Sequence, residues 1–257
     1  MTAHPKVTLV TCKSMPNLVK GEEGLLDELA ARGCEPQIKV WNDPDVDWSE
    51  AGMVVVRSVS DYASDRQAFL EWTKQLRRVQ NSADVLNWNT DKHYLKELAA
   101  LGMPTIPTNW LEPEQNLSKH QIHTRFPAFG EFVVKPAVSS GVRDIGRYTT
   151  VDTRQRQAAM RQVQGLLGEG RSVMIQRYVE EIDLHGEISL VFFNGLVSHA
   201  VEKRSALHPA SVSDAAVHEA VVTAEAADSV AWKWGEEIRR VLHGYVRSRL
   251  GHDEQFL

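Results

Sequence analysis

Strand and helix patterns alternate over the first third of the chain, and this alternation constrains the fold most. Segments 7–11, 37–41 and 53–56 are apolar enough for buried strands, whereas 22–32 and 65–79 carry apolar residues at helical spacing. Strands separated by helices are typical of a parallel sheet in an α/β layer. The turn after the first strand lacks a Gly-x-Gly-x-x-Gly pattern, so support for a nicotinamide-binding site is weak.

Composition narrows the function classes. The 257 residues suit one large domain or two small ones, and a net charge of −5 without a long basic run argues against nucleic-acid binding. No segment approaches the ~20 apolar residues of a membrane span, and the N-terminus has no signal-peptide pattern. Cys12 and Cys34 are too few for a disulfide framework or a zinc site. We therefore expect a cytoplasmic protein with reduced thiols and no membrane or nucleic-acid partner.

The rest of the chain has a more mixed pattern. We predict a helix over 91–101 with Asn89 and Thr90 as caps, a polar connection over 112–130, a helix over 153–167, and strands over 132–136, 173–179, 187–193 and 196–202. Asn194-Gly195 predicts a tight hairpin turn. A long final helix carries one apolar stripe, for which core packing is favoured over a partner: Val230, Trp234, Ile238, Val241, Leu242 and Tyr245.

Two lysines have a context that suits phosphate binding. Lys92 lies at the start of a predicted helix, and Lys135 ends an apolar strand that leads into the small, polar loop 137–146. An ammonium group beside a Ser/Gly loop can approach a phosphate closely. The loop is not a Walker A sequence, and a surface lysine beside an ordinary turn is the alternative.

Two strands carry further candidates. Segment 174–179 suits an adenine edge through its backbone groups, although the segment taken alone favours a plain core strand. In the hairpin, a two-residue turn places Glu187 opposite Glu202. Two facing carboxylates destabilise a sheet unless a cation, a bulge or solvation separates them.

These features follow one another in a characteristic order. The chain contains Thr90-Asp91-Lys92, then Leu98 to Thr108 with its Gly-Met-Pro-Thr core, then Phe132-Val133-Val134-Lys135-Pro136, then Gln176-Arg177-Tyr178-Val179 and the Glu-bearing hairpin. The ordered set resembles the ATP-grasp superfamily. The resemblance implies two α+β subdomains that close on ATP and a lid over its phosphates.

A narrower resemblance lies in five segments. They are similar to the group of ATP-grasp ligases that includes O-ureido-D-serine cyclo-ligase, and they are Arg57 to Tyr62, Phe69 to Trp72, Asn87 to Leu95, His185 to Gly195 and Ser198 to Lys203. Ser60 stands where that group has Trp, which puts the substrate pocket in question. The implied reaction is the ATP-dependent closure of O-ureido-D-serine to D-cycloserine in antibiotic biosynthesis. Another amino-acid or peptide ligase, similar to glutathione synthetase, and a nucleotide-binding module without turnover are the alternatives.

The implied fold is α/β with an α+β lid: an ATP-grasp fold preceded by a Rossmann-like parallel-sheet domain. We place the N-terminal domain, on the substrate side, at 1–88 and a connecting helix and linker at 89–130. The lid subdomain follows at 131–180 and an incomplete C-terminal ATP-grasp subdomain at 181–257.

Site residues follow from the resemblance by position. It implies that Lys92 and Lys135 contact the ATP phosphates and that the lid contains Ser139, Ser140 and Gly141. It implies that the adenine slot is formed by Gln176, Arg177, Tyr178 and Val179. It also implies that Glu187 contacts the ribose and that Lys203 or Arg204 supplies a further cation. The count along the hairpin puts Arg204, not Lys203, on the face of Glu187 unless a bulge intervenes. Arg57, Asp61 and Tyr62 are the candidates for binding a small amino-acid-like substrate. Arg57 ends a strand, where a guanidinium suits a carboxylate; a structural salt bridge is the alternative.

Magnesium is implied together with ATP, but its ligands are unknown. In the superfamily they lie on strands that follow the long final helix, and the chain ends at Gln255-Phe256-Leu257, where the first such strand would begin. We therefore expect a missing terminal segment of roughly 40 residues, the size of a few strands and turns. A homodimer is left open.

Overall fold

The structure is a computed structural model that describes residues 4–19, 21–203, 207, 219–222 and 229–250. The chain divides into two compact units, Met1–Asp91 and Lys92–Leu257, and each is described by itself. No helix among the described residues has the length and apolarity needed to cross a membrane.

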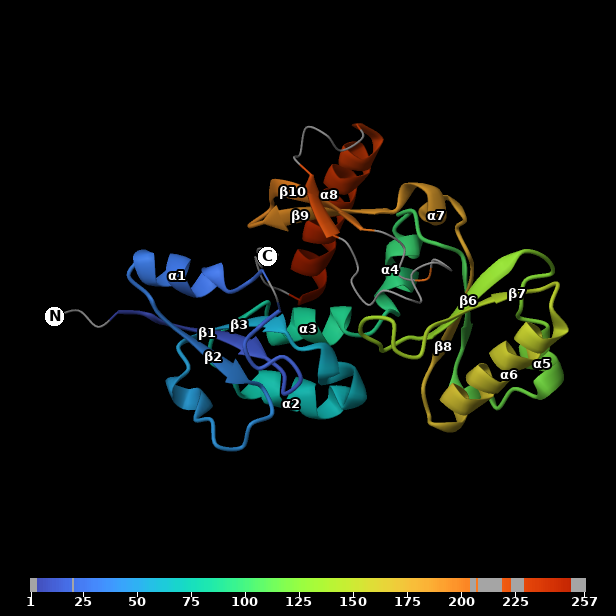
Figure 1. The fold of residues 1–257 in the computed structure, drawn as a ribbon, viewed down its shortest axis with the longest axis horizontal. Helices are drawn as coiled ribbons and strands as arrows, with labels where there is room; N and C mark the ends of the chain where they lie inside the picture. The colour runs from blue at the N-terminus through green and yellow to red at the C-terminus, as the bar shows by residue number, and fades with distance from the viewer. Residues whose placement is uncertain (1–3, 20, 204–206, 208–218, 223–228, 251–257) are drawn as a thin grey trace. The chain divides into compact units, whose positions relative to one another are not determined.

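The first unit is built on a parallel sheet with the strand order β2-β1-β3-β4, which confirms the prediction of an α/β layer (Figure 1). Trp41, Phe69 and Trp72 pack edge-on or tilted against one another in its core, beside Val10 and Val54. The strands are β1 (Lys6–Thr11), β2 (Glu35–Val40), β3 (Met53–Ser58) and β4 (Val79–Gln80), and the helices are α1 (Gly24–Ala31), α2 (Arg66–Gln75) and α3 (Ala83–Asn89), with single turns at Trp48–Glu50 and Ser60–Ser64.

Two predicted helices have different bounds in the structure. The helix predicted over 65–79 ends at Gln75, because Leu76 is extended and Val79 pairs with Val54 in β4. The helix predicted over 91–101 begins only at Tyr94, and the unpredicted α3 precedes it. Thr90 therefore does not cap the later helix; its hydroxyl donates to the carbonyl of Leu86 at the end of α3.

The second unit contains an antiparallel sheet with the order β5-β8-β6-β7. Helices α5 and α6 pack on one face of this sheet around Phe132, Val134, Val163 and Ile175 (Figure 1). The predicted polar connection over 112–130 holds α5 and a single turn at Pro113–Gln115. The elements are α4 (Tyr94–Ala100), β5 (Thr108–Leu111), α5 (Lys119–His123), β6 (Glu131–Pro136), β7 (Gly146–Thr149), α6 (Thr153–Gly168) and β8 (Val173–Arg177).

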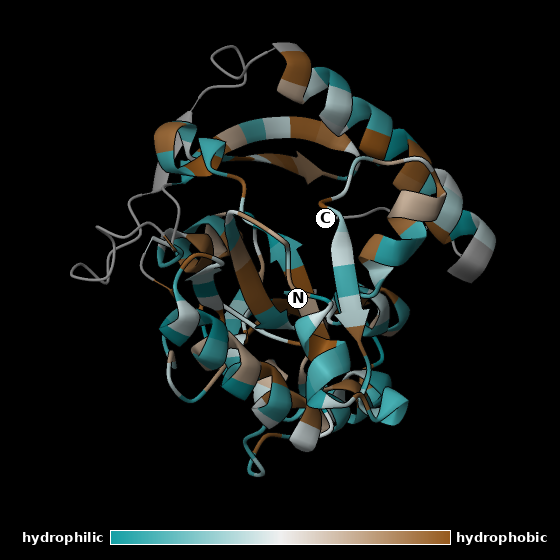
Figure 2. Ribbon diagram, turned by 90° about the vertical axis from the view of Figure 1, so that its right-hand side faces the viewer, coloured by the Kyte–Doolittle hydropathy of each residue, from teal (hydrophilic) through white to brown (hydrophobic). Residues whose placement is uncertain are grey.

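A second antiparallel sheet of this unit, ordered β11-β10-β9, packs against a long helix. Gly235 on the helix lies so close to Leu190 on β9 that a Cβ there would collide with the leucine side chain. Figure 2 shows brown and teal residues alternating along the helices, as expected for elements with one face on a sheet. The elements are α7 (Glu181–His185), β9 (Glu187–Phe193), β10 (Leu196–Lys203), β11 (Glu219–Val222) and α8 (Ser229–Leu250).

The β9–β10 hairpin corrects the predicted pairing. Asn194 and Gly195 both have positive φ and form the expected two-residue turn, with Phe193 opposite Leu196. A bulge at Ser198 then shifts the register by one residue. Lys203, not Glu202, therefore lies opposite Glu187, and two facing carboxylates are avoided.

Candidate functional site

The strand register brings the polar side chains of Thr108, Lys135 and Gln176 to one face of the β5-β8-β6-β7 sheet. Thr108 pairs with Gln176, and Lys135 pairs with Met174, whose side chain shares a face with that of Gln176. The alternate residues on the same strands point the other way, into the core beneath α5 and α6. We call the face that carries Thr108, Lys135 and Gln176 the site face.

A cavity of about 380 Å³ lies over the site face. Its walls are mostly apolar, and Lys135 and Gln176 supply polar groups. An apolar slot with few polar groups is typical of a small-ligand site. The other lining residues are Tyr94, Leu95, Leu98, Met103, Pro104, Thr105, Ile106 and Ile238.

Glu112, at the end of β5, ties α4 to the sheet beside this cavity. Its carboxylate oxygen lies 3.0 Å from both His93 Nε2 and Lys96 Nζ. Burial raises the pKa of Glu112, but hydrogen bonds from Ser172, His93 and Lys96 outweigh burial and lower the pKa to about 2. His93 also stacks on Trp110, with 4.5 Å between ring centroids. The helix that forms one wall of the cavity is thus held by an ionised carboxylate.

Lys135 is shielded from solvent in this cavity. Burial lowers the pKa of its ammonium group, and the negative charge of Glu187 partly offsets that effect. Glu187 in turn lies opposite Lys203 across the hairpin. A shielded cation that tolerates partial desolvation is well placed to bind an anion.

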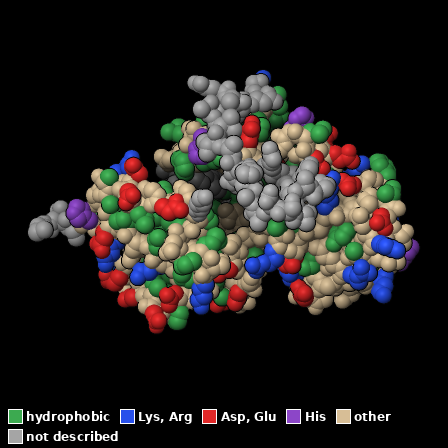
Figure 3. All heavy atoms as spheres, viewed as in Figure 1, with side chains coloured by type: hydrophobic (Ala, Val, Ile, Leu, Met, Phe, Trp, Pro, Cys, Tyr) green, Lys and Arg blue, Asp and Glu red, His purple; other side chains and the backbone are tan. Residues whose placement is uncertain are grey.

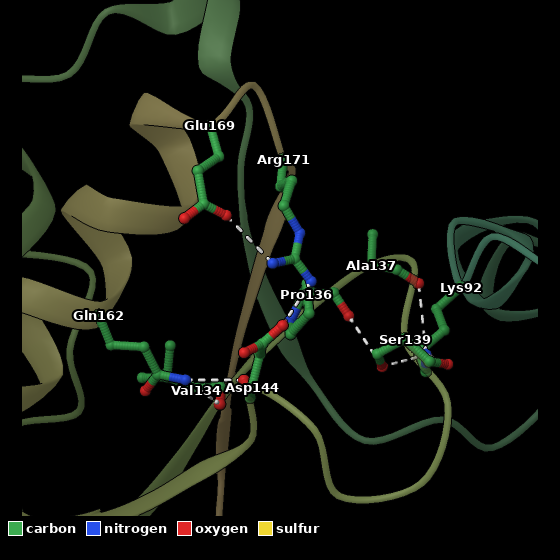
Figure 4. Close-up of polar contacts among 9 residues, drawn as sticks. All are labelled: Lys92, Val134, Pro136, Ala137, Ser139, Asp144, Gln162, Glu169 and Arg171. Carbon is green, nitrogen blue, oxygen red and sulfur yellow. Dashed lines mark hydrogen bonds and ion pairs between the residues drawn. The ribbon is translucent and has the colours of Figure 1, made fainter. Parts of the chain in front are cut away.

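The loop 137–146 contacts Lys92 at its first residues. The Lys92 ammonium group donates to Ser139 Oγ at 2.7 Å and to the Ser139 carbonyl at 3.0 Å, and the Lys92 backbone N–H donates to Ala137 (Figure 4). Lys92 lies just before α4, not within its first turn as predicted. These contacts hold the Lys92 side chain beside the first residues of the loop.

The far end of the same loop is anchored to α6 and to the turn between α6 and β8. Asp144 forms an ion pair with Arg171 at 2.8 Å, and Gln162 donates to the Asp144 carbonyl at 2.7 Å (Figure 4). Asp144 has a left-handed backbone with φ of 59°. Between the two anchors, Gly141 has φ of 62° and open space around it. The anchored ends leave a short exposed tip that includes Gly141.

Arg147 on β7 is a partly buried cation that was not predicted from the sequence. It forms ion pairs with Glu131 and with Asp183, the latter at 2.8 Å, and its guanidinium lies 3.7 Å from the ring centroid of Tyr178. Burial lowers the pKa of Arg147, but these carboxylates outweigh burial and raise it. Tyr178 also donates its hydroxyl to Asp183. The arrangement fixes the chain where it leaves β8.

The remaining residues of the predicted adenine slot differ in position. The backbone N–H of Tyr178 donates to Glu131, and the carbonyl of Val179 accepts from Ile182, so neither group is open for a ligand without a rearrangement or a shared bond. Arg177 follows Gln176 on β8 and lies on the opposite face of the strand, with its guanidinium 4.5 Å from the ring centroid of Phe129. The structure thus does not bring Arg177 to the cavity.

The predicted substrate residues lie in the first unit, at or after the end of β3. Arg57 forms an ion pair with Glu22, which is the structural alternative considered for it. Asp61 accepts a hydrogen bond from the indole N–H of Trp41 at 2.7 Å. The ring of Tyr62 lies 5.6 Å from that of Phe69. These side chains gather at the carboxyl ends of parallel strands, where α/β proteins bind ligands.

Cys12 directly follows β1, at the same edge of the sheet, and has polar neighbours. Its Sγ lies 3.2 Å from Ser14 Oγ and 3.8 Å from Ser60 Oγ. Burial raises the pKa of the Cys12 thiol, but hydrogen bonds from Ser14 and Ser60 help to lower it overall. Ser60, which departs from the implied family pattern, is therefore part of this polar group.

Metal ligands are not grouped among the described residues. Those residues contain no set of three or more His, Cys, Asp or Glu side chains placed to bind a metal ion. Arg204 and the segment Gln255-Phe256-Leu257 lie outside the described residues. On the face shown in Figure 3, Lys and Arg are interspersed with Asp and Glu.

Comparison with solved structures defines the class of fold. D-alanyl-alanine synthetase A from Vibrio cholerae superposes with a TM-score of 0.63 over 96% of this chain and 82% of that chain, at 14% identity. At that identity the likeness concerns the fold alone. The fold is that of an ATP-grasp ligase, as the ordered motifs implied.

Three further similarities define the family within that class. Residues 7–87 match the family model of the N-terminal domain of D-cycloserine synthetase DcsG. A crystal structure of D-cycloserine synthetase DcsG superposes with a TM-score of 0.79 and 30% identity, over 96% of this chain and 82% of that chain. The cycloserine biosynthesis protein DcsG of Streptomyces lavendulae is 36% identical over 200 residues, which are 76% of this chain and 64% of that relative. The chain belongs to the D-cycloserine synthetase family of ATP-grasp proteins.

Proposed function

We propose that the second unit binds ATP on the site face. Adenine occupies the apolar cavity beside Gln176, and the phosphates lie toward Lys135, Lys92 and the loop 137–146. The observation that carries this proposal is the joint placement of Lys135 and Gln176 in one cavity. Membership of an ATP-grasp family supports it independently.

The other nucleotide contacts are proposed from the same placement. The part of the loop with Ser139, Ser140 and Gly141 covers the phosphates, and Glu187 accepts from the ribose hydroxyls. Lys203 supplies the additional cation, because the bulge at Ser198 sets it opposite Glu187. Tyr178 and Val179 border the adenine, whereas the position of Arg177 on the other face of β8 favours a supporting role.

We propose that the reaction is the ATP-dependent cyclisation of O-ureido-D-serine to D-cycloserine. The γ-phosphoryl group moves to an acyl or ureido oxygen, and ADP leaves; closure to D-cycloserine requires the acyl oxygen of the serine carboxylate. The oxygen-bound nitrogen of the ureido group then attacks the activated acyl carbon, so that the ring C–N bond forms as phosphate departs. Water removes the carbamoyl group from that nitrogen as carbamate, which gives CO₂ and NH₃. Lys135, Lys92 and Lys203 would neutralise charge that shifts between the phosphates, and the closed loop would exclude water. Magnesium is expected with ATP.

The first unit would bind the amino-acid-like end of the substrate. Arg57 would bind its carboxylate by exchanging its present partner Glu22 for the substrate, and Asp61 and Tyr62 would border the pocket. If Arg57 has this role, Arg57→Met raises the Michaelis constant for the amino substrate far more than that for ATP. Equal effects on both would assign Arg57 to its ion pair with Glu22.

The experiment is turnover with ATP, Mg²⁺ and O-ureido-D-serine, with D-cycloserine and ADP measured together. Formation of both in equal amounts supports the proposal. ADP formed only with a different amino acid or peptide would indicate another ATP-grasp ligase. Nucleotide binding without ADP release from any of these substrates would indicate a binding module.

A further inference from the structure

We propose that Thr108 fixes the side-chain amide of Gln176 with its oxygen toward the cavity, which makes Thr108 a specificity-determining residue for adenine over 6-oxopurines. The proposal rests on the proposed ATP site and concerns how that site distinguishes one purine from another. It assigns a positioning role to a residue that belongs to neither the phosphate loop nor the cavity lining.

The hydroxyl group of Thr108 has one proton, and the structure shows where it goes. Thr108 Oγ1 donates to the carbonyl of Ile106 at 2.8 Å. The same oxygen lies 2.7 Å from Gln176 Nε2, across the β5–β8 pair. Because its proton is already used, Thr108 can only accept in that second contact. The amide nitrogen of Gln176 must therefore point at Thr108.

The amide oxygen of Gln176 then has a defined direction. Gln176 is only 5% exposed, yet it lines the cavity together with Lys135. Among the described residues, one fully buried side-chain nitrogen or oxygen lacks a hydrogen-bond partner, and it is Nε1 of Trp72. No described residue donates a hydrogen bond to the Gln176 side-chain oxygen, so this oxygen is accessible from the cavity.

A fixed acceptor in an apolar slot selects for a donor on the ligand. Adenine carries an amino group at position 6, whereas hypoxanthine and guanine carry a carbonyl oxygen there. A flipped amide would present its NH₂ to that carbonyl, but it would cost the bond from Thr108 to Ile106 or leave two acceptors facing each other. A site that must leave a buried polar group unpaired rejects the wrong ligand.

The test measures the affinities of the full chain for ATP and ITP by calorimetry. ATP has an amino group at position 6 of the purine, whereas ITP has a carbonyl oxygen there. We expect the wild type to prefer ATP. Thr108→Val keeps the shape of the side chain but removes the acceptor, so the amide can turn. The ATP/ITP affinity ratio should fall about three- to tenfold, the effect of one hydrogen bond, and the affinity for ITP should rise. Thr108→Ser retains the hydroxyl and should retain the ratio.

A second background separates orientation from a general effect on the site. In Gln176→Leu the amide is absent, so adding Thr108→Val should leave the ratio unchanged. If Thr108→Val weakens ATP and ITP equally, or leaves the ratio within about twofold of a wild type that binds ATP, Thr108 does not orient the amide. If the wild type binds neither nucleotide, the proposed ATP site itself is wrong.

Discussion

Replacing Lys135 by Met should separate nucleotide binding from stability. The ammonium group lies shielded in the cavity, where burial lowers its pKa. A hydrogen bond from a charged group contributes about 1.5–3 kcal/mol, so loss of one phosphate contact should lower the affinity for ATP about 10- to 150-fold. Methionine keeps an apolar stem of similar length, so the walls of the cavity stay packed.

The free variant should be at least as stable as the wild type. Because the pKa of Lys135 is lower in the folded than in the unfolded protein, its charge is unfavourable to folding. The stability of the wild type should therefore rise with pH between the folded and the unfolded pKa, and this rise should be missing in the variant. Glu187, the group that offsets the effect, remains opposite Lys203.

Calorimetry and thermal unfolding give two independent measures. Nucleotide at 100 times the wild-type Kd stabilises the folded state by about 2.7 kcal/mol, whereas a 100-fold weaker variant gains only about 0.4 kcal/mol. Lys119→Met is the matched control, because Lys119 is exposed on α5, away from the site face. Unchanged ATP affinity in Lys135→Met would refute the reasoning, and so would a large loss of stability in the free variant.

Three further predictions follow from single contacts. In a double-mutant cycle of Asp144→Asn and Arg171→Gln, the effects of the two substitutions on ATP affinity should be coupled by about 0.5–1 kcal/mol. Strictly additive effects would show that this ion pair does not anchor the loop for ATP binding. Gly52→Ala should destabilise the fold by more than about 3 kcal/mol in urea unfolding, because its φ is 69° and a Cβ would collide with the Lys6 carbonyl; Gly33→Ala, with φ of 76° and no such collision, should cost about 1–2 kcal/mol. The carboxylate of Glu112, with its pKa near 2, should contribute about 1 kcal/mol to the free energy of unfolding above pH 4.5 and progressively less as the pH falls toward 2. A difference in the free energy of unfolding between wild type and Glu112→Gln that persists at pH 2 would contradict this assignment.

The sheet of the first unit could be predicted from the sequence because its strands are continuous short apolar segments. Helices with an apolar stripe separate them, and this alternation specifies parallel pairing. The bounds were harder to predict. Val79 continues the helical spacing of α2, yet pairing with Val54 places it in a strand. Tertiary pairing overrode a local pattern there.

Sequence reasoning placed a lysine beside a small, polar loop where the two are adjacent in the chain. Lys135 and the loop 137–146 are consecutive, so their proximity follows from covalent connection. Arg147 was missed because Glu131, Asp183 and Tyr178 approach it only through the fold. The orientation of Gln176 likewise depends on Thr108, from a strand far away in sequence.

The hairpin shows how one extra residue changes a site. Counting back from Asn194-Gly195 correctly pairs Phe193 with Leu196 and predicts a clash of carboxylates further on. The bulge at Ser198 removes it and brings Lys203 opposite Glu187. An alternating pattern does not mark the position of a bulge, because nearly every residue of β10 is at most partly buried.

The most direct test of the central claim is a crystal structure of the chain with a non-hydrolysable ATP analogue. Adenine should lie in the cavity over the site face, with its amino nitrogen within about 3.2 Å of the Gln176 oxygen. Phosphate oxygens should lie at the ammonium groups of Lys135 and Lys92. A nucleotide bound elsewhere, or in this cavity with its phosphates turned away from both lysines, would contradict it.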